Sequence, residues 1–105
     1  MSFEALLLQL RADRYFMRDV VAWERVPAQP GRYASFPAAL DMRLREVLGV
    51  HGIDQLYTHQ AAAIDSVLRG EHACVVTSTA SGKTLCYNLP VLNSLLRDPQ
   101  ATALY

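Results

Sequence analysis

The stretch ACVVTSTASGKT, residues 73–84, constrains the fold of this chain more than any other. Its apolar, β-branched start predicts a strand over His72–Thr77, and the periodicity that follows predicts a helix from about Lys83 to Arg97. A short polar loop ending in Gly-Lys-Thr lies between them. Lys83 is also the only lysine in a chain with nine arginines. A strand, a loop of small residues and a helix in this order indicate an α/β fold with a phosphate-binding loop.

The loop nearly matches the phosphate-binding pattern G-x-x-x-x-G-K-[ST], with Thr77 in place of the first glycine. Gly82 permits close backbone approach, and the helix N-terminus directs amide donors at an anion. Lys83 adds a mobile charge for the β- and γ-phosphates, and the Thr84 hydroxyl suits a Mg²⁺ ion that bridges them. We expect the site to comprise Ser78, Thr79, Ala80, Ser81, Gly82, Lys83 and Thr84. The alternative is an ordinary helix start with an exposed lysine.

Three further helices are expected before the loop. Residues 3–19 show an amphipathic pattern with Ser2 as N-cap. After a turn-rich linker over Pro27–Ser35, a second helix should begin near Ser35 or Pro37 and end at Gly49 or Gly52. A third should run over 58–69, with Thr58 as N-cap and Gly70 as its stop. At the other end, Ala101–Tyr105 begins another β-leaning run, so we expect the chain to be the front part of a larger domain.

Composition excludes some classes of function. The formal net charge is zero, so no global field attracts nucleic acid or an anionic membrane. No apolar run approaches the roughly 20 residues that span a bilayer, and we expect no membrane partner. Cys74 and Cys86 have neither a CxxC partner nor a histidine at metal-ligand spacing, which predicts reduced packing cysteines in a cytoplasmic protein.

Ser78–Thr84 resembles motif I of superfamily 2 DEAD/DEAH-box ATP-dependent helicases. The longer string TSTASGKTLCYNLPVL is similar to a narrower group, the helicases related to the bacterial mitomycin-repair helicase and its fungal RecQ-like relatives. Ala80 departs from the usual loop glycine. The resemblance implies a RecA-like P-loop domain with a parallel sheet and flanking helices, ATP and Mg²⁺ as cofactors, Lys83 in a catalytic role, and DNA, or possibly RNA, as the partner of parts beyond residue 105.

The stretch from Gly52 to Gln60, GIDQLYTHQ, resembles the Q-motif of these helicases. The resemblance assigns Gln60 to the adenine edge, which an amide suits because it both donates and accepts a hydrogen bond. Tyr57 is expected to line the base pocket. Phe36 is the candidate for the upstream aromatic that stacks on adenine, with Tyr33 as second choice. The alternatives are a Gln60 that bonds backbone at a helix start and a Phe36 that only packs; His59 receives no chemical role.

These expectations divide the chain into a helical accessory lead-in, 1–32, and the first part of a RecA-like ATP-binding domain, 33–105. The sequence contains no Asp-Glu or Asp-Asp pair of the kind that hydrolyses ATP in this class. We therefore expect the ATP-binding portion of a helicase whose hydrolytic residues lie elsewhere, and which is inactive on its own. Two alternatives stay open: a P-loop nucleotide kinase or other ATPase, and a non-enzymatic interaction module with an incidental Gly-Lys-Thr.

Overall fold

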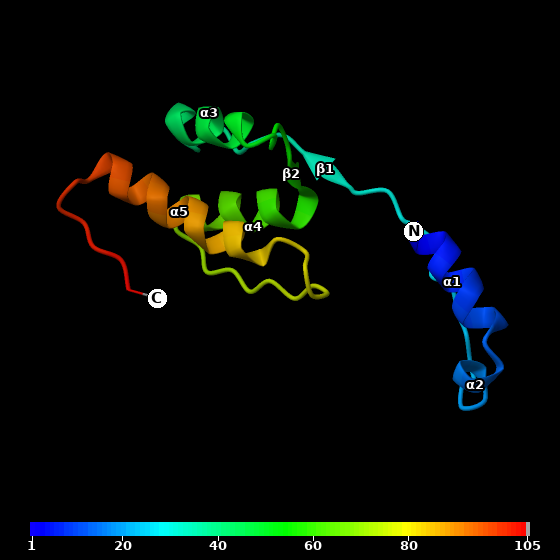
Figure 1. Cartoon of the computed structure of the whole chain (residues 1–105). Coiled ribbons are helices and arrows are strands. Elements are labelled where there is room, and N and C mark those ends of the chain that lie inside the picture. The colour runs from blue at the N-terminus through cyan, green and yellow to red at the C-terminus, as the bar shows by residue number, and fades with distance from the viewer. Residues whose placement is uncertain (105) are drawn as a thin grey trace.

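The computed structural model describes residues 1–104 as an elongated molecule of 63 × 27 × 23 Å. One group of elements, α3–α5 with two short strands, lies apart from the N-terminal helices (Figure 1). The elements in chain order are α1 (Phe3–Ala12), α2 (Arg14–Met17), β1 (Tyr33–Ala34), α3 (Met42–Val50), β2 (Leu56–Tyr57), α4 (Thr58–Leu68) and α5 (Lys83–Arg97).

The expected helix over 3–19 is interrupted at Asp13. The Asp13 carboxylate accepts hydrogen bonds from the backbone N–H groups of Tyr15 (2.8 Å) and Phe16 (3.1 Å). A short polar side chain that captures nearby amides in this way ends one helix and caps the next. The prediction of a single helix is therefore wrong, and α1 and α2 form in its place.

Trp23 is the packing centre of this N-terminal part. The Arg11 guanidinium lies 5.3 Å from the centre of its ring, within cation–π range, and Phe16 meets it edge-on at 6.5 Å. An exposed ion pair between Arg25 and Glu4 (2.6 Å) joins the following segment back to α1. No residue of α1 or α2 is buried, so these contacts hold a surface structure and not a core.

The hydrophobic core lies among α3, α4, α5 and β2. Its buried members come from all four elements and the lead-in to α3: Leu40, Leu48, Leu56, Ala61, Ile64 and Leu89. The contact between α4 and α5 is the most extensive in the molecule, and Figure 1 shows these helices side by side. α3 begins at Met42 with Asp41 as N-cap, later than Ser35 or Pro37, because Leu40 belongs to the core and the chain turns there before the helix starts.

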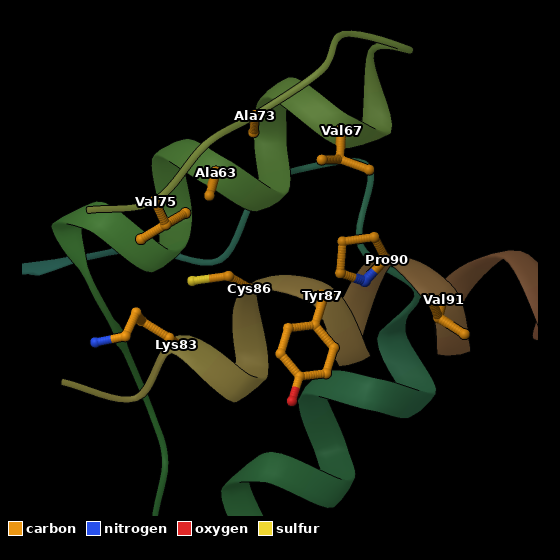
Figure 2. A pocket seen from close by; sticks show the side chains of 9 residues that line it. All are labelled: Ala63, Val67, Ala73, Val75, Lys83, Cys86, Tyr87, Pro90 and Val91. Atoms are coloured by element: carbon orange, nitrogen blue, oxygen red, sulfur yellow. The ribbon is translucent and has the colours of Figure 1, made fainter. Parts of the chain in front are cut away.

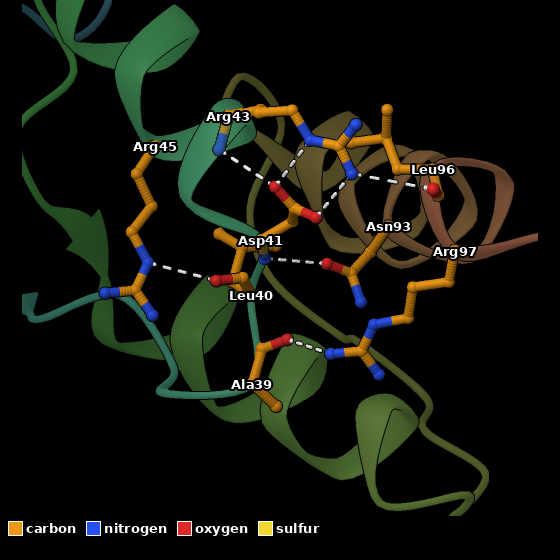
Figure 3. A network of polar contacts seen from close by, with 8 residues as sticks. All are labelled: Ala39, Leu40, Asp41, Arg43, Arg45, Asn93, Leu96 and Arg97. Atoms are coloured by element: carbon orange, nitrogen blue, oxygen red, sulfur yellow. Dashed lines mark hydrogen bonds and ion pairs between the residues drawn. The ribbon is translucent and has the colours of Figure 1, made fainter.

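A polar network fastens the lead-in of α3 to the end of α5 (Figure 3). Asn93 is almost fully buried, and its Oδ1 accepts a hydrogen bond from the Asp41 backbone N–H at 2.8 Å. Arg97 donates to the Ala39 carbonyl at 2.9 Å, and Arg45 donates to the Leu40 carbonyl at 3.1 Å. Buried polar groups require such partners, so this network fixes how α3 sits on α5.

The sheet differs from the expectation. Within residues 1–104 the only sheet is the antiparallel pair β1–β2, with Tyr33 opposite Tyr57 and Ala34 opposite Leu56. His72–Thr77 is not a strand, and neither is the described part of the run that begins at Ala101; Tyr105 lies outside the described residues. Strands form by pairing with another strand, and within residues 1–104 neither segment has a neighbouring strand to pair with. A parallel sheet is thus not present here.

Candidate nucleotide-binding site

The loop between residues 77 and 82 is tightly folded. Gly82, the N-cap of α5, has φ +76°, and Ala80 adopts φ +58°, a conformation that residues with a Cβ rarely take. The Thr77 and Ser81 hydroxyls lie 2.5 Å apart across the loop. The left-handed backbone at Ala80 and this cross-link return the chain to the start of α5.

Lys83 folds its side chain back over the loop. Its Nζ donates to the Ser78 carbonyl at 2.7 Å and to the Thr77 carbonyl at 3.2 Å, with the Ser81 and Thr77 hydroxyls each at 3.3 Å. An ammonium group has three hydrogens, so these oxygens share them. The charge therefore lies at the loop, held by neutral acceptors that a phosphate oxygen can replace.

Gln60 joins α4 to this loop. Its side chain is 3% exposed; Oε1 accepts from the Tyr57 backbone N–H at 2.9 Å and Nε2 donates to the Gly82 carbonyl at 2.8 Å. Both polar ends of the amide thus bond protein backbone, which is the alternative to an adenine contact that the sequence left open for Gln60. A contact with adenine requires exchanging at least one of these bonds, and that role stays a prediction.

His59, to which the sequence assigned no chemistry, also contacts the loop. Its Nε2 lies 2.8 Å from the Ser81 carbonyl oxygen, and its ring stacks on that of Tyr57 with centres 5.8 Å apart and planes 8° from parallel. The one feature of the sequence that could have indicated this contact is the position of His59 beside Gln60, on the first turn of α4. Sequence spacing alone could not reveal a partner 22 residues away.

A cavity of about 470 Å³ adjoins the loop on the β1–β2 side. Its walls include the rings of Tyr33 and Tyr57, which stack with centres 5.2 Å apart. The neighbouring Tyr57 phenol raises the pKa of Tyr33, chiefly by charge interaction. The cavity is lined by Tyr33, Gly52, Ile53, Asp54, Gln55, Tyr57, Gln60, Gly82 and Leu85.

The structure thus brings Tyr57, Gln60 and Gly82 together around one cavity, with Tyr33 as the second aromatic wall. Phe36 is not among the lining residues; it is half-buried and packs against the hydrophobic core. The remaining site candidates, Ser78, Thr79, Ala80 and Thr84, are exposed on the loop and the first turn of α5.

A second cavity, of about 560 Å³, lies between α4 and α5 under residues 73–75 (Figure 2). Its lining is mostly apolar, and Lys83 stands at one end of it. Cys86 is buried on this face, and burial is the main cause that raises the pKa of its thiol. These walls suit hydrophobic packing and not recognition of a polar ligand.

Comparison with known proteins defines the class to which this site belongs. Residues 57–105 match the family model of the DEAD/DEAH box helicases. This confirms the predicted resemblance to superfamily 2 helicases: residues 57–105 are similar to part of a helicase domain. Within residues 1–104, no helix has the length and apolarity needed to cross a bilayer.

Two relatives that match nearly the whole chain are named as ATP-dependent helicases. The chain is 43% identical to YprA of Bacillus subtilis over 94% of its own length and 13% of that protein, and 36% identical to hrq1 of Schizosaccharomyces pombe over 99% of its length and 10% of that protein. The crystal structure of the DUF1998 helicase MrfA bound to DNA and AMPPNP superposes with a TM-score of 0.77 at 40% identity, covering 94% of this chain and 13% of that one. The chain thus spans 10–13% of the length of these three proteins.

Proposed function

We propose that this chain is the ATP-binding portion of an ATP-dependent DNA helicase. The observation that carries the proposal is that one residue, Gly82, belongs both to the loop under the Lys83 ammonium and to the wall of the cavity beside Gln60. A nucleotide with its base in that cavity would have its phosphates at the N-terminus of α5. In the full-length protein, binding and hydrolysis of ATP would drive strand unwinding.

The phosphates would be held by the loop and by α5. This helix has fifteen residues, long enough for its N-terminal amides and dipole to favour an anion. Lys83 would exchange its contacts with Ser78 and Thr77 for phosphate oxygens, a charge-assisted replacement of neutral acceptors. Ser78–Gly82 would supply backbone donors. Lys83 is the catalytic candidate because it would stabilise charge that develops on the transferred phosphoryl group.

Magnesium would be bound through ATP and Thr84. Mg²⁺ keeps several waters and uses few protein ligands when phosphates are present, so one exposed hydroxyl on the first turn of α5 fits its needs. Among residues 1–104 no cluster of three or more histidine, cysteine or acidic side chains offers a dedicated metal site. We therefore propose that Thr84 contacts the ion only in the presence of ATP.

The base would enter the cavity between the two tyrosines and Gln60. Tyr33 takes the stacking role in this proposal in place of Phe36, because it lines the cavity while Phe36 packs on the core. Gln60 would read adenine after its amide gives up one backbone partner. The RecA-like parallel sheet belongs to the same proposal: residues 72–77 would pair once neighbouring strands are available.

DNA is proposed as the substrate of the full-length protein from its relatives. MrfA is described as bound to DNA, whereas a relative of lower coverage, 43% identical over 56 residues, is an RNA helicase of Arabidopsis thaliana. Of the two, the relative that matches nearly the whole chain favours DNA. The zero net charge agrees with contacts made by other parts of such a protein.

The test is nucleotide affinity measured by isothermal titration with Mg²⁺ for the native chain and for Lys83→Ala. Loss of a charge-assisted contact should weaken ATP binding at least about tenfold. Arg69→Ala is the matched control, since it removes an exposed cation that pairs with Asp65 and Glu71 away from the loop. ATP should also bind better than GTP, a preference that Gln60→Ala should remove. Equal affinity in native and Lys83→Ala protein would contradict the proposal.

A further inference from the structure

Two consecutive side chains at the start of α4 contact two consecutive carbonyl groups of the loop. His59 Nε2 lies 2.8 Å from the Ser81 oxygen, and Gln60 Nε2 lies 2.8 Å from the Gly82 oxygen. We propose that His59 is a positioning residue for the phosphate-binding loop, which it holds so that the Gly82 N–H faces the ligand. This inference rests on the proposed function and extends it to a residue with no expected role.

The geometry of the peptide bond supplies the reason. All peptide bonds of the described chain are trans, and in a planar trans peptide the C=O and the N–H point in opposite directions. The Ser81 carbonyl and the Gly82 N–H belong to one such plane. When His59 holds the carbonyl toward α4, the amide N–H must point away from α4. Gln60 does the same for the next plane, which carries the Lys83 N–H.

The His59 ring is itself held in place. Because a carbonyl oxygen only accepts hydrogen bonds, the contact requires a proton on Nε2 of the ring. Stacking against Tyr57 with planes 8° apart limits rotation of the ring, and the side chain is half-buried. A donor that is already ordered loses little entropy when it binds. The contact therefore restrains the loop more strongly than a flexible donor would.

Without this contact the loop would lose a restraint at the place where its backbone conformation is least common. Ala80, with φ +58°, directly precedes Ser81, and Gly82, with φ +76°, directly follows it. The Ser81–Gly82 peptide adjoins the left-handed Gly82 and lies one residue after the left-handed Ala80, so it has other orientations available when no side chain fixes its carbonyl. A rotated Ser81–Gly82 plane would turn a carbonyl, in place of an N–H, toward a phosphate. His59 would prevent this orientation.

Two substitutions separate the donor from the ring. His59→Phe keeps an aromatic ring to stack on Tyr57 and removes the donor, whereas His59→Gln keeps an N–H donor at a similar reach and removes the ring. The full chain is titrated with ATP and with adenosine in the presence of Mg²⁺. We expect His59→Phe to weaken ATP about five- to tenfold, the effect of one hydrogen bond. Adenosine, which has no phosphate, should stay within about twofold, and His59→Gln should restore most of the ATP affinity.

A second measurement needs no nucleotide. Amide hydrogen exchange across residues 78–83 should accelerate in His59→Phe and stay near native in His59→Gln. If native protein binds ATP and His59→Phe matches it in both measurements, the positioning role is wrong. The same follows if His59→Gln is as impaired as His59→Phe. If native protein binds no ATP but exchange still accelerates only in His59→Phe, the loop-holding role stands and the proposed function fails.

Discussion

The Gln60 side chain donates from Nε2 to the Gly82 carbonyl oxygen at 2.8 Å, so the first turn of α4 is bonded to the residue that starts α5. The close approach depends on glycine. A Cβ at Gly82 would overlap the Gln60 amide nitrogen, and the φ of +76° is one that residues with a Cβ disfavour.

Gly82→Ala should therefore lower both stability and ATP affinity. Gly70→Ala is the matched control, because Gly70 has a similar φ of +83° but a Cβ there would have no other atom within 4 Å. We expect Gly70→Ala to cost about 1 kcal/mol of unfolding free energy from backbone strain alone. Gly82→Ala should cost more and should also weaken ATP binding. Urea denaturation and titration of both variants check this, and equal effects would show that the contact with Gln60 does not matter.

Substitution of Tyr33 should lower ATP affinity, whereas substitution of Phe36 should lower stability. Tyr33→Ala removes a wall of the cavity, so ATP affinity should fall about tenfold while stability changes little, since this side chain is exposed. Phe36→Ala removes core contacts and should cost about 2 kcal/mol of unfolding free energy. Thermal melts and ATP titrations of both variants provide the comparison. A larger loss of affinity in stably folded Phe36→Ala would return the stacking role to Phe36.

Asn93→Ala should lower the free energy of unfolding more than substitution of a less buried polar residue does. It leaves the Asp41 N–H without its acceptor in a part-buried setting, a loss of about 1–3 kcal/mol. Asn88→Ala is the control, as it makes the same change on the same helix at a half-buried position. Denaturant midpoints measure the difference. Equal costs for the two variants would mean that the network in Figure 3 contributes nothing specific.

Asp41 should contribute a pH-dependent part of stability. Hydrogen bonds from Arg43 lower the pKa of its carboxyl from 3.8 to about 2. A lowered pKa in the folded state means that the contribution is complete above pH 4 and is lost as pH falls toward 2. Asp41→Asn removes the charge and keeps a good helix N-cap. The stability difference between native and Asp41→Asn protein should shrink over this window, and a difference that stays constant with pH would refute the assignment.

The two cysteines should react with maleimide at different rates. Cys74 is exposed, while Cys86 is 7% exposed and its thiol has a pKa raised chiefly by burial. Because the thiolate is the reactive form, we expect Cys74 to be modified at least about tenfold faster at neutral pH. Cys74→Ser and Cys86→Ser identify each phase by mass spectrometry. Similar rates would show that the face of α5 in Figure 2 opens readily.

Local signals predicted the helices that have clear boundaries. The helix Lys83–Arg97 was predicted with the observed bounds, because Gly82 precedes it and Asp98-Pro99 ends it. The helix over 58–69 was nearly correct, and Gly70 has the positive φ of a helix stop. Asp13 was missed because the apolar periodicity passes through it, although its carboxylate captures two amides.

Long-range contacts account for what the sequence could not predict. Pairing decides whether residues 72–77 form a strand, and no pattern within the segment specifies a neighbour. The site shows the same division: the Gly-Lys-Thr signal located the loop, but the side-chain contacts of His59 and Gln60 with it join residues far apart in the chain. The sequence ranked Phe36 above Tyr33 for stacking on the base, because nothing in it shows that Phe36 packs on the core while Tyr33 lines the cavity.

The contacts of His59 and Gln60 with the loop each close a segment of 22 residues, and this has a consequence for the order of folding. Helices such as α4 and α5 form locally within about a microsecond. Closing the segment between them carries an entropic cost that only docking of the two helices offsets. We therefore expect the phosphate-binding loop to take up its contacts with α4 only after both helices have formed. ATP would then recognise only chains that have completed this step, and its binding would report on folding itself.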